Sequence, residues 1–155
     1  MYSKKIFKEI NSFSKSLALA RKNNVLIKPL PNNVLKDINL VKIIRMFAEA
    51  KLEWQPIGFK IGATNKKIIK LLKAKEPFYS YLFSEQTFNS NSKLKLTPGT
   101  LGIELEIAYK ISKKIFNTKL NNGKQLKNYI YGVAPAIELV GYRQKLNKIK
   151  YVGSA

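Results

Sequence analysis

Two glutamates, Glu104 and Glu106, stand in an otherwise apolar stretch of this chain, residues 102–109. Residues two apart point to the same face of a β-strand, so the two carboxylates are expected side by side. In a dry environment their like charges repel unless one is protonated or a cation lies between them. Glu138 occurs in a similar run of small and branched apolar residues. Three such carboxylates are enough to hold a hard divalent ion.

The absence of two residue types limits the reactions and metal sites that this chain can support. The chain has no cysteine and no histidine. Disulfides, zinc fingers, Cys or His nucleophiles and Ser-His-Asp triads are therefore excluded, and any metal ion must be bound through oxygen. The alternative for the three glutamates is that they are surface carboxylates paired with some of the many lysines. Against it, three of only nine acidic residues lie in apolar segments, where an ordinary surface carboxylate is not expected.

The strongly basic composition has two interpretations. A net charge of +20 is compatible with binding to nucleic-acid phosphates. However, arginine occurs only at positions 21, 45 and 143, and all other basic residues are lysines spread along the whole chain. Readers of phosphates and bases usually use arginine forks. The pattern favours a solvated lysine surface over a nucleic-acid interface.

The first third of the chain has the spacing of helices. Between Tyr2 and Asn23, apolar residues recur on one helical face, with lysines on the other. A turn-rich connection with two prolines follows, and Asp37 is expected to cap a second helix. We expect a helical amino-terminal layer over residues 1–54. The longest apolar runs are too short for a signal peptide or a membrane span, so we expect a cytoplasmic protein that does not enter a membrane.

Strand patterns begin after this layer. Residues 56–64 alternate so that Lys60 shares a face with Gly58 and Gly62, where the backbone is open to a ligand. The alternative is an edge-strand lysine that points to solvent. A turn and strand are expected over residues 76–83, and further strands near residues 101–111 and 134–140. Thr64 or Asn65 is expected to cap a short helix, and another short helix is expected over residues 124–131. This order indicates one α+β domain over residues 1–155, with a β-rich core over residues 55–155.

Several segments together resemble a known family. The segments are Gly58-Phe59-Lys60-Ile61-Gly62-Ala63-Thr64, Glu76-Pro77-Phe78-Tyr79, Glu104-Leu105-Glu106-Ile107-Ala108, and Pro135-Ala136-Ile137-Glu138 followed by Arg143. In order, spacing and type they look like the successive motifs of the 2-keto-4-pentenoate hydratase and 4-oxalocrotonate decarboxylase family. This family is a branch of the fumarylacetoacetate hydrolase superfamily. The resemblance extends from the first helix to the end of the chain.

The resemblance implies a set of roles for these residues. It implies Mg²⁺ or Mn²⁺ bound by Glu104, Glu106 and Glu138, and a lyase that acts as a hydratase or decarboxylase on a small 2-oxo acid or 2-hydroxydienoate in aromatic-compound catabolism. The ion would stabilise an enolate as a Lewis acid. Lys60 matches the lysine beside the substrate and would donate or shuttle a proton. The substrate would be bound by Gly62, Ala63, Thr64 and Arg143.

The chain also departs from the family pattern. Gly141 and Tyr142 stand before Arg143 where the family usually has Asp-Ser, and Lys75 stands where an acid usually precedes Glu-Pro. Relatives continue into further core strands, so the resemblance implies a mixed β-sheet roll of the fumarylacetoacetate hydrolase type that is truncated at its carboxyl end. We therefore expect a homo-oligomer. Two other functions remain open, an inactive metal- or partner-binding remnant of the family and a basic nucleic-acid-binding protein.

Overall fold

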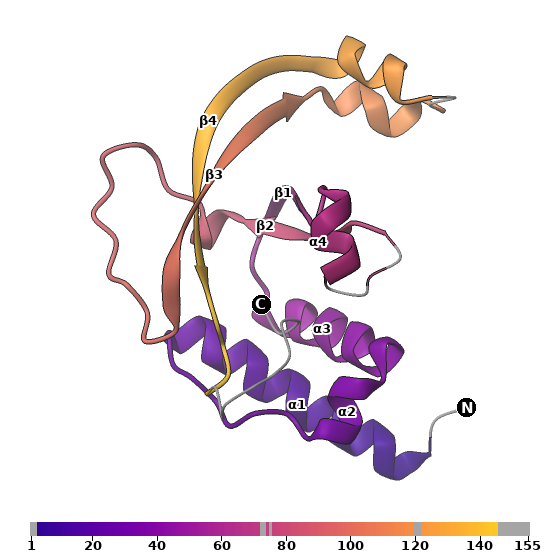
Figure 1. The fold of residues 1–155 in the computed structure, drawn as a ribbon, viewed down its shortest axis with the longest axis vertical. Helices are drawn as coiled ribbons and strands as arrows, with labels where there is room; N and C mark the ends of the chain where they lie inside the picture. Colours follow the sequence, from indigo (N-terminus) through magenta and orange to yellow (C-terminus); the bar gives the residue numbers. More distant parts are fainter. Residues whose placement is uncertain (1–2, 72–73, 75, 120–121, 146–155) are drawn as a thin grey trace. The chain divides into compact units, whose positions relative to one another are not determined.

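The structure is a computed structural model that describes residues 3–71, 74, 76–119 and 122–145. It contains α-helices and β-strands in an α+β arrangement, as predicted. The chain divides into two compact units, and each is described here by itself (Figure 1). The helical unit comprises residues 1–99 and 142–155, and the ribbon unit comprises residues 100–141. The predicted single domain over 1–155 stays a prediction.

The helical unit begins with a long helix, α1 (Lys4–Asn23). The hydroxyl of Ser3 accepts a hydrogen bond from the Ile6 amide at 3.4 Å and caps its amino end. Asn24, with φ of 52°, ends the helix in the left-handed conformation. The sequence predicted a helix from Tyr2 to about Asn23, and Tyr2 lies outside the described residues. Its apolar spacing and the two caps explain why this segment is a helix.

Two further helices follow the proline-rich connection. The short helix α2 (Asn32–Lys36) forms where the sequence predicted only a turn. Pro31 is its N-cap, and the Pro31 carbonyl accepts hydrogen bonds from the amides of Val34 at 2.9 Å and Leu35 at 3.1 Å. The helix α3 (Ile38–Leu52) begins as predicted, since the Asp37 carboxylate accepts from the amides of Asn39 at 3.0 Å and Leu40 at 3.1 Å. All three helices lie within the predicted helical layer.

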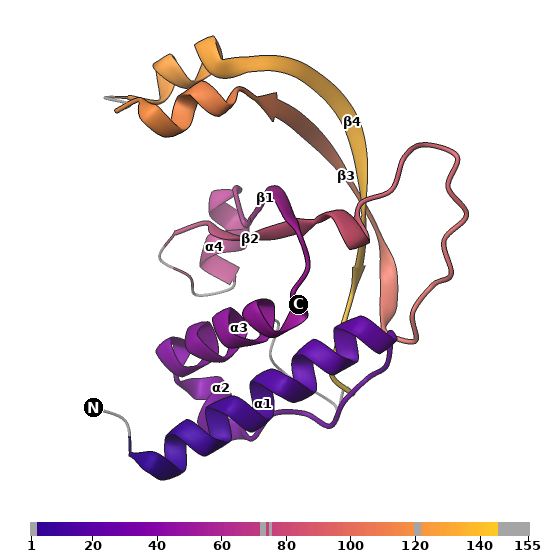
Figure 2. The same cartoon turned by 180° about the vertical axis from the view of Figure 1, so that it is seen from behind.

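The helices α1 and α3 pack side by side, as both views show (Figures 1 and 2). Their contact is sealed by Ile10 and Ile44, which are 2% and 1% exposed. Each such buried side chain stabilises the fold by about 1.5–3 kcal/mol relative to an exposed one. Ser14 is also buried there, and its hydroxyl donates to the Ile10 carbonyl at 2.6 Å and lies 3.1 Å from the Ile44 carbonyl. This cluster is the main core, and it consists of Ile10, Leu30, Val34 and Ile44 surrounded by Ile6, Phe13, Leu17, Leu35, Leu40 and Ile43.

The helical unit also contains a two-stranded antiparallel sheet. Its strands are β1 (Pro56–Gly62) and β2 (Phe78–Phe83), and the helix α4 (Lys66–Leu71) lies between them in the sequence. The amide of Lys67 donates to the Asn65 side chain at 2.8 Å, which places the predicted cap at Asn65. A 3-10 turn, η1 (Ser84–Gln86), follows β2. Phe83 anchors the sheet in a second small core with Ala18 and Leu52.

The ribbon unit is a second antiparallel sheet of two long strands, β3 (Thr100–Ile111) and β4 (Ile130–Gly141). The strands pair in regular register from Gly102 opposite Val140 to Lys110 opposite Gly132, with a bulge at each end. They are joined through two 3-10 segments, η2 (Lys113–Asn117) and η3 (Gly123–Tyr129). The helix expected over residues 124–131 is therefore a 3-10 segment that gives way to β4 at Ile130.

The mixed sheet roll that the resemblance implies stays a prediction. Within the described residues, both named sheets have two strands and are antiparallel, and parallel pairing is limited to a bridge between Ile27 and Gln144. Regular alternation predicts the strands but not which strands pair. Among the described helices, none has both the length and the apolar character needed to cross a bilayer.

Candidate metal centre

The predicted carboxylates come together on one face of the ribbon unit. Glu104 and Glu106 are two residues apart on β3, so their side chains share a face. Glu104 lies directly opposite Glu138 on β4, which puts the third carboxylate on the same face. One carboxylate oxygen from each of the three residues lies within 4.8 Å of the others. The structure thus brings together all three residues predicted as metal ligands.

Several residues beside the carboxylates on the same face have small side chains or none. Ala136 lies opposite Glu106, and the next pair along the ribbon is Ala108 with Ala134. On the other side lies Gly102, where an added Cβ would meet no atom within 4 Å. Glu104 and Glu106 are exposed, while Glu138 is half-buried. The face therefore leaves room for water or a small ligand beside the carboxylates.

The electrostatics of this arrangement favour a cation. Like charges directly across an antiparallel pair destabilise it, and here a third carboxylate stands beside the pair. Mg²⁺ binds oxygen at 2.0–2.1 Å, so ligands on opposite sides of the ion are about 4.2 Å apart. Adjacent ligands of such an ion are about 2.9 Å apart. The three oxygens, which lie within 4.8 Å of one another, would therefore move closer together to share one ion. The donor set is all oxygen and fits a hard divalent ion such as Mg²⁺ or Mn²⁺.

Lys60 lies in the helical unit, on β1 opposite Ser80 of β2, and its side chain is exposed. It shares a face with Gly58 and Gly62, as the alternation predicted. However, the space that was expected over the glycine backbone beside Lys60 is occupied at one end. An added Cβ at Gly62 would lie 2.6 Å from the Phe78 ring, because that ring packs over the glycine. The glycine at position 62 thus accommodates an aromatic neighbour from β2.

The residues after Lys60 include a strained position. Ala63 has φ of 56°, in the left-handed region that costs a non-glycine residue roughly 1–2 kcal/mol. Such conformations concentrate at functional sites, where surrounding structure maintains them. Thr64 is exposed, and Gly62 and Ala63 are half-buried. The predicted substrate-binding segment is thus a sharp, partly accessible turn between β1 and α4.

Arg143 follows β4 and lies in the helical unit. Its carbonyl accepts a hydrogen bond from the Ile27 amide at 3.1 Å, and the next residue, the buried Gln144, accepts from the Leu30 amide at 2.7 Å. These bonds fix the backbone of Arg143 beside the connection between α1 and α2. Burial lowers the pKa of Arg143, although it remains a cation at neutral pH.

The sequence analysis did not predict a role for a second arginine, Arg21, on which the charge of Arg143 acts. Burial, together with repulsion from Arg143, lowers the pKa of Arg21, and the charge of Glu49 acts in the opposite direction. The guanidinium of Arg21 lies 5.5 Å from the centre of the Trp54 ring and 5.0 Å from that of Phe83, and its Nε donates to Gln86 at 2.7 Å. These contacts come from elements far apart in the sequence, so no local pattern could indicate them.

The predicted site residues are therefore distributed over both units. Glu104, Glu106 and Glu138 converge within the ribbon unit. Lys60 and the residues at positions 62–64 lie on and just after β1, and Arg143 lies beside Ile27, all within the helical unit.

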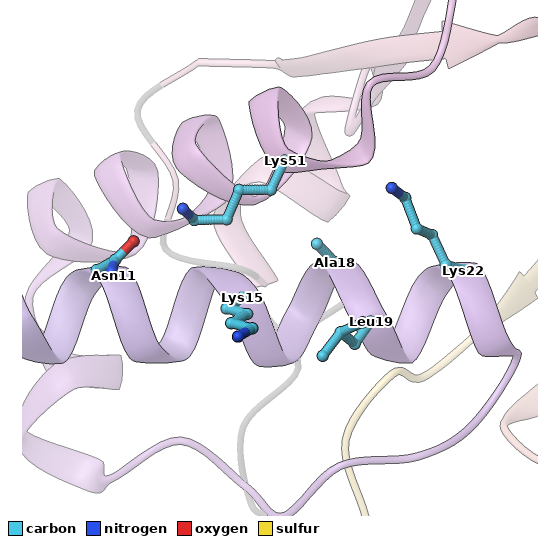
Figure 3. Close-up of a pocket in the computed structure, with 6 residues that line it drawn as sticks. All are labelled: Asn11, Lys15, Ala18, Leu19, Lys22 and Lys51. Carbon is cyan, nitrogen blue, oxygen red and sulfur yellow. The ribbon is translucent and has the colours of Figure 1, made fainter.

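A basic groove of about 430 Å³ also lies in the helical unit (Figure 3). Its lining residues come from α1 and α3, and none of them was predicted as a site residue. A signal for part of it exists in the sequence, since the lining positions 11, 15, 18 and 22 fall on one face of a helix. The lining residues are Asn11, Lys15, Ala18, Leu19, Lys22 and Lys51.

No protein-family model matches the chain, and no curated protein matches it.

Proposed function

We propose that this chain is a divalent-metal-dependent lyase, a hydratase or decarboxylase, that acts on a small 2-oxo acid or 2-hydroxydienoate in aromatic-compound catabolism. The observation that carries the proposal is the convergence of three carboxylates, Glu104, Glu106 and Glu138, on one face of the ribbon unit. The substrate class comes from the resemblance of the sequence segments to the hydratase and decarboxylase family. With it, the proposal includes the fumarylacetoacetate hydrolase type of sheet roll and a cytoplasmic location.

The three glutamates have a defined task in this proposal. They hold Mg²⁺ or Mn²⁺ through oxygen and leave coordination positions for water and for the 2-oxo-carboxylate group of the substrate. When bound, the ion supplies Lewis-acid stabilisation of negative charge on the substrate oxygen. The exposure of Glu104 and Glu106 and the small neighbours on their face support access of a ligand to the ion.

The remaining roles rest on the resemblance. Lys60 donates or shuttles a proton, since an ammonium group is a proton donor. The backbone of Gly62, Ala63 and Thr64 binds the substrate, and the left-handed conformation of Ala63 supports a functional role for this turn. Arg143 pairs with a substrate carboxylate through its guanidinium.

Metal binding is the first test. We expect Mn²⁺ to bind wild-type protein in a calorimetric or electron-paramagnetic-resonance titration. We expect Glu106→Gln to weaken the affinity by more than about tenfold, because a charged carboxylate ligand is replaced by a neutral amide. Glu9→Gln on α1 is the matched control and should bind as the wild type does. Equal affinities in the wild type and Glu106→Gln would refute the site.

Turnover is the second test and separates the enzyme from an inactive remnant. With Mn²⁺ bound, we expect the protein to convert 2-hydroxypentadienoate, and the loss of ultraviolet absorbance of this substrate measures the conversion. We expect Lys60→Ala to abolish conversion while Mn²⁺ affinity is retained. Metal binding without conversion of 2-hydroxypentadienoate or of a 2-oxo acid with a second carboxylate would favour the remnant.

A further inference from the structure

The connection between the two strands of the ribbon unit contains an asparagine followed by a glycine. This pair, Asn122-Gly123, occurs once in the chain. Asn122 precedes the 3-10 segment η3, Gly123 is the first residue of that segment, and both residues are exposed. Asparagine is among the thermolabile residues, because the backbone nitrogen of the next residue can attack its side-chain amide. A glycine in the next position leaves this nitrogen unshielded by any side chain.

The side chain of Asn122 is not held by the segment that it precedes. Asp37 and Ser112 cap the helical segments after them through side-chain oxygens, whereas the side chain of Asn122 makes no such hydrogen bond. The backbone of Asn122 is extended, with φ of −158° and ψ of 165°. Its side-chain amide can therefore turn toward the backbone of Gly123 without breaking a capping hydrogen bond.

The backbone nitrogen of Gly123 is open to this approach. The first amides of a helical segment have no acceptor within that segment, and Gly123 is the first residue of η3. A Cβ added at Gly123 would meet no atom of the described residues within 4 Å, its two chain neighbours aside. The attack is therefore not blocked by packing around the glycine.

The charge around the pair favours the reaction. The amide nitrogen attacks after losing its proton, and the attack passes through a tetrahedral intermediate that carries a negatively charged oxygen. Nearby positive charge stabilises both anions. The sequence within five residues of Asn122 contains no acidic residue and three lysines, Lys119, Lys124 and Lys127.

We propose that Asn122 is a site of spontaneous deamidation, which converts it to aspartate and isoaspartate through a succinimide. The nitrogen of Gly123 bonds to Cγ of Asn122, the bond from Cγ to the side-chain nitrogen breaks, and ammonia leaves with the proton of the Gly123 amide. Water then opens the five-membered ring. Cleavage between Cγ and the ring nitrogen gives aspartate, and cleavage between the backbone carbonyl carbon and the ring nitrogen gives isoaspartate. The reaction consumes water, releases ammonia and oxidises or reduces no atom.

The modification changes the connection and not the carboxylate cluster. It replaces a neutral amide by a carboxylate in a lysine-rich segment, and isoaspartate also adds a methylene group to the backbone. The paired register of the ribbon ends with Ile111 opposite Ile130, so Asn122 lies outside it. The proposal therefore does not depend on the metal site. Isoaspartate carries an α-carboxylate outside the backbone, which is the group that isoaspartyl methyltransferases esterify with S-adenosylmethionine.

The test is incubation of the wild-type protein at mildly alkaline pH. We expect the intact mass to rise by about 1 Da as an amide becomes a carboxylate. Trypsin cleaves after Lys119 and Lys124, so Asn122 is recovered in one short peptide. It should convert at least about tenfold faster than Asn89 and Asn91, exposed asparagines that precede serines, because a small difference in activation barrier gives this ratio. The rate should rise with pH, since the nitrogen must lose its proton.

Gly123→Ala is the matched control. The glycine has open space at its Cβ position and no positive φ, so alanine should keep the fold, as circular dichroism can verify, and crowd only the nitrogen. We expect conversion of Asn122 to slow by at least about tenfold in this variant. Methyl transfer from S-adenosylmethionine by an isoaspartyl methyltransferase should fall in proportion.

Asn122→Gln keeps the test decisive if Gly123→Ala does not fold. Attack on glutamine would need a larger ring, so this variant should lose the first rise in mass that the wild type shows. Conversion of Asn89 or Asn91 before Asn122 would overturn the proposal. Equal conversion rates in the wild type and in folded Gly123→Ala, or an unchanged first rise in mass in Asn122→Gln, would overturn it as well.

Discussion

At the scale of single residues, the metal site depends on where Glu138 lies relative to Glu104. The spacing of Glu104 and Glu106 is enough to predict that they share a face, because alternation in a strand is independent of the rest of the fold. The position of Glu138 required the pairing register of β3 with β4, which places it directly opposite Glu104. Two ligands were therefore predictable by geometry, and the third only by its residue type and apolar surroundings.

A titratable residue gives a prediction at the same scale. Burial raises the pKa of Glu49 on α3, and the charges of Arg45 and Arg21 oppose the shift only in part. The folded protein therefore binds a proton at Glu49 more tightly than the unfolded chain, whose glutamate pKa is about 4.3. The contribution of Glu49 to stability is present below this value and is lost as pH rises through the raised folded pKa.

We expect Glu49→Gln to remove this dependence. The free energy of unfolding of the wild type, measured relative to that of the variant by urea denaturation, should fall as pH rises from about 4.3 through the folded pKa and become constant above it. A difference that rises with pH across this window would show that the ion pair with Arg45, at 3.9 Å, outweighs the burial.

At the scale of elements, local sequence signals such as helix caps predicted where helices begin. Contacts between segments far apart in the sequence could not be predicted. Asp37 marks the start of α3, and Asn65 that of α4, because caps act within three residues. The 3-10 segment η3 looks like a helix in sequence, and only its hydrogen-bonding pattern separates the two. Gly62 was interpreted as an opening for ligand, but Phe78 fills it, since the partner strand of β1 could not be identified from spacing.

The cap of α3 provides a prediction at this scale. Asp37→Ala removes the acceptor for two amides at the start of the helix and should lower the free energy of unfolding by about 1 kcal/mol. Asp37→Asn is the matched control, because asparagine caps helices about as well as aspartate. Thermal or urea unfolding followed by circular dichroism measures both. Similar losses in the two variants would mean that the charge of Asp37, and not the cap, stabilises α3.

At the scale of the whole molecule, the dominant property is the charge of +20. Such an excess destabilises a compact state through self-repulsion and favours contact with polyanions. The basic groove between α1 and α3 gathers three of the lysines, and Lys22 among them is 3.9 Å from Glu53. The sequence predicted the charge but not the groove, because the lysine of α3 reaches it only when the two helices pack.

We expect added salt to stabilise the protein. Raising NaCl from about 0.1 M to about 1 M shortens the screening length from about 10 Å to about 3 Å and relieves repulsion among the lysines. The melting temperature should rise by roughly 2–4 °C for each kcal/mol of repulsion that is removed. KCl at equal concentrations should give the same rise, since screening does not depend on the identity of the cation. A fall in the melting temperature would show that the ion pairs outweigh the repulsion.

The two faces of the ribbon unit also constrain how the chain can change. If β4 slipped by one residue along β3, every side chain of the moving strand would exchange faces. Glu138 would then turn to the opposite face, among apolar side chains such as Leu105, and apolar side chains of β4 would turn toward Glu104 and Glu106. A substitution in the ribbon alters one position, whereas an insertion or deletion of one residue between Gly132 and Val140 disrupts the carboxylate cluster and the apolar pairs on the opposite face together. Changes in length, more than changes in residue type, are what this part of the protein cannot tolerate.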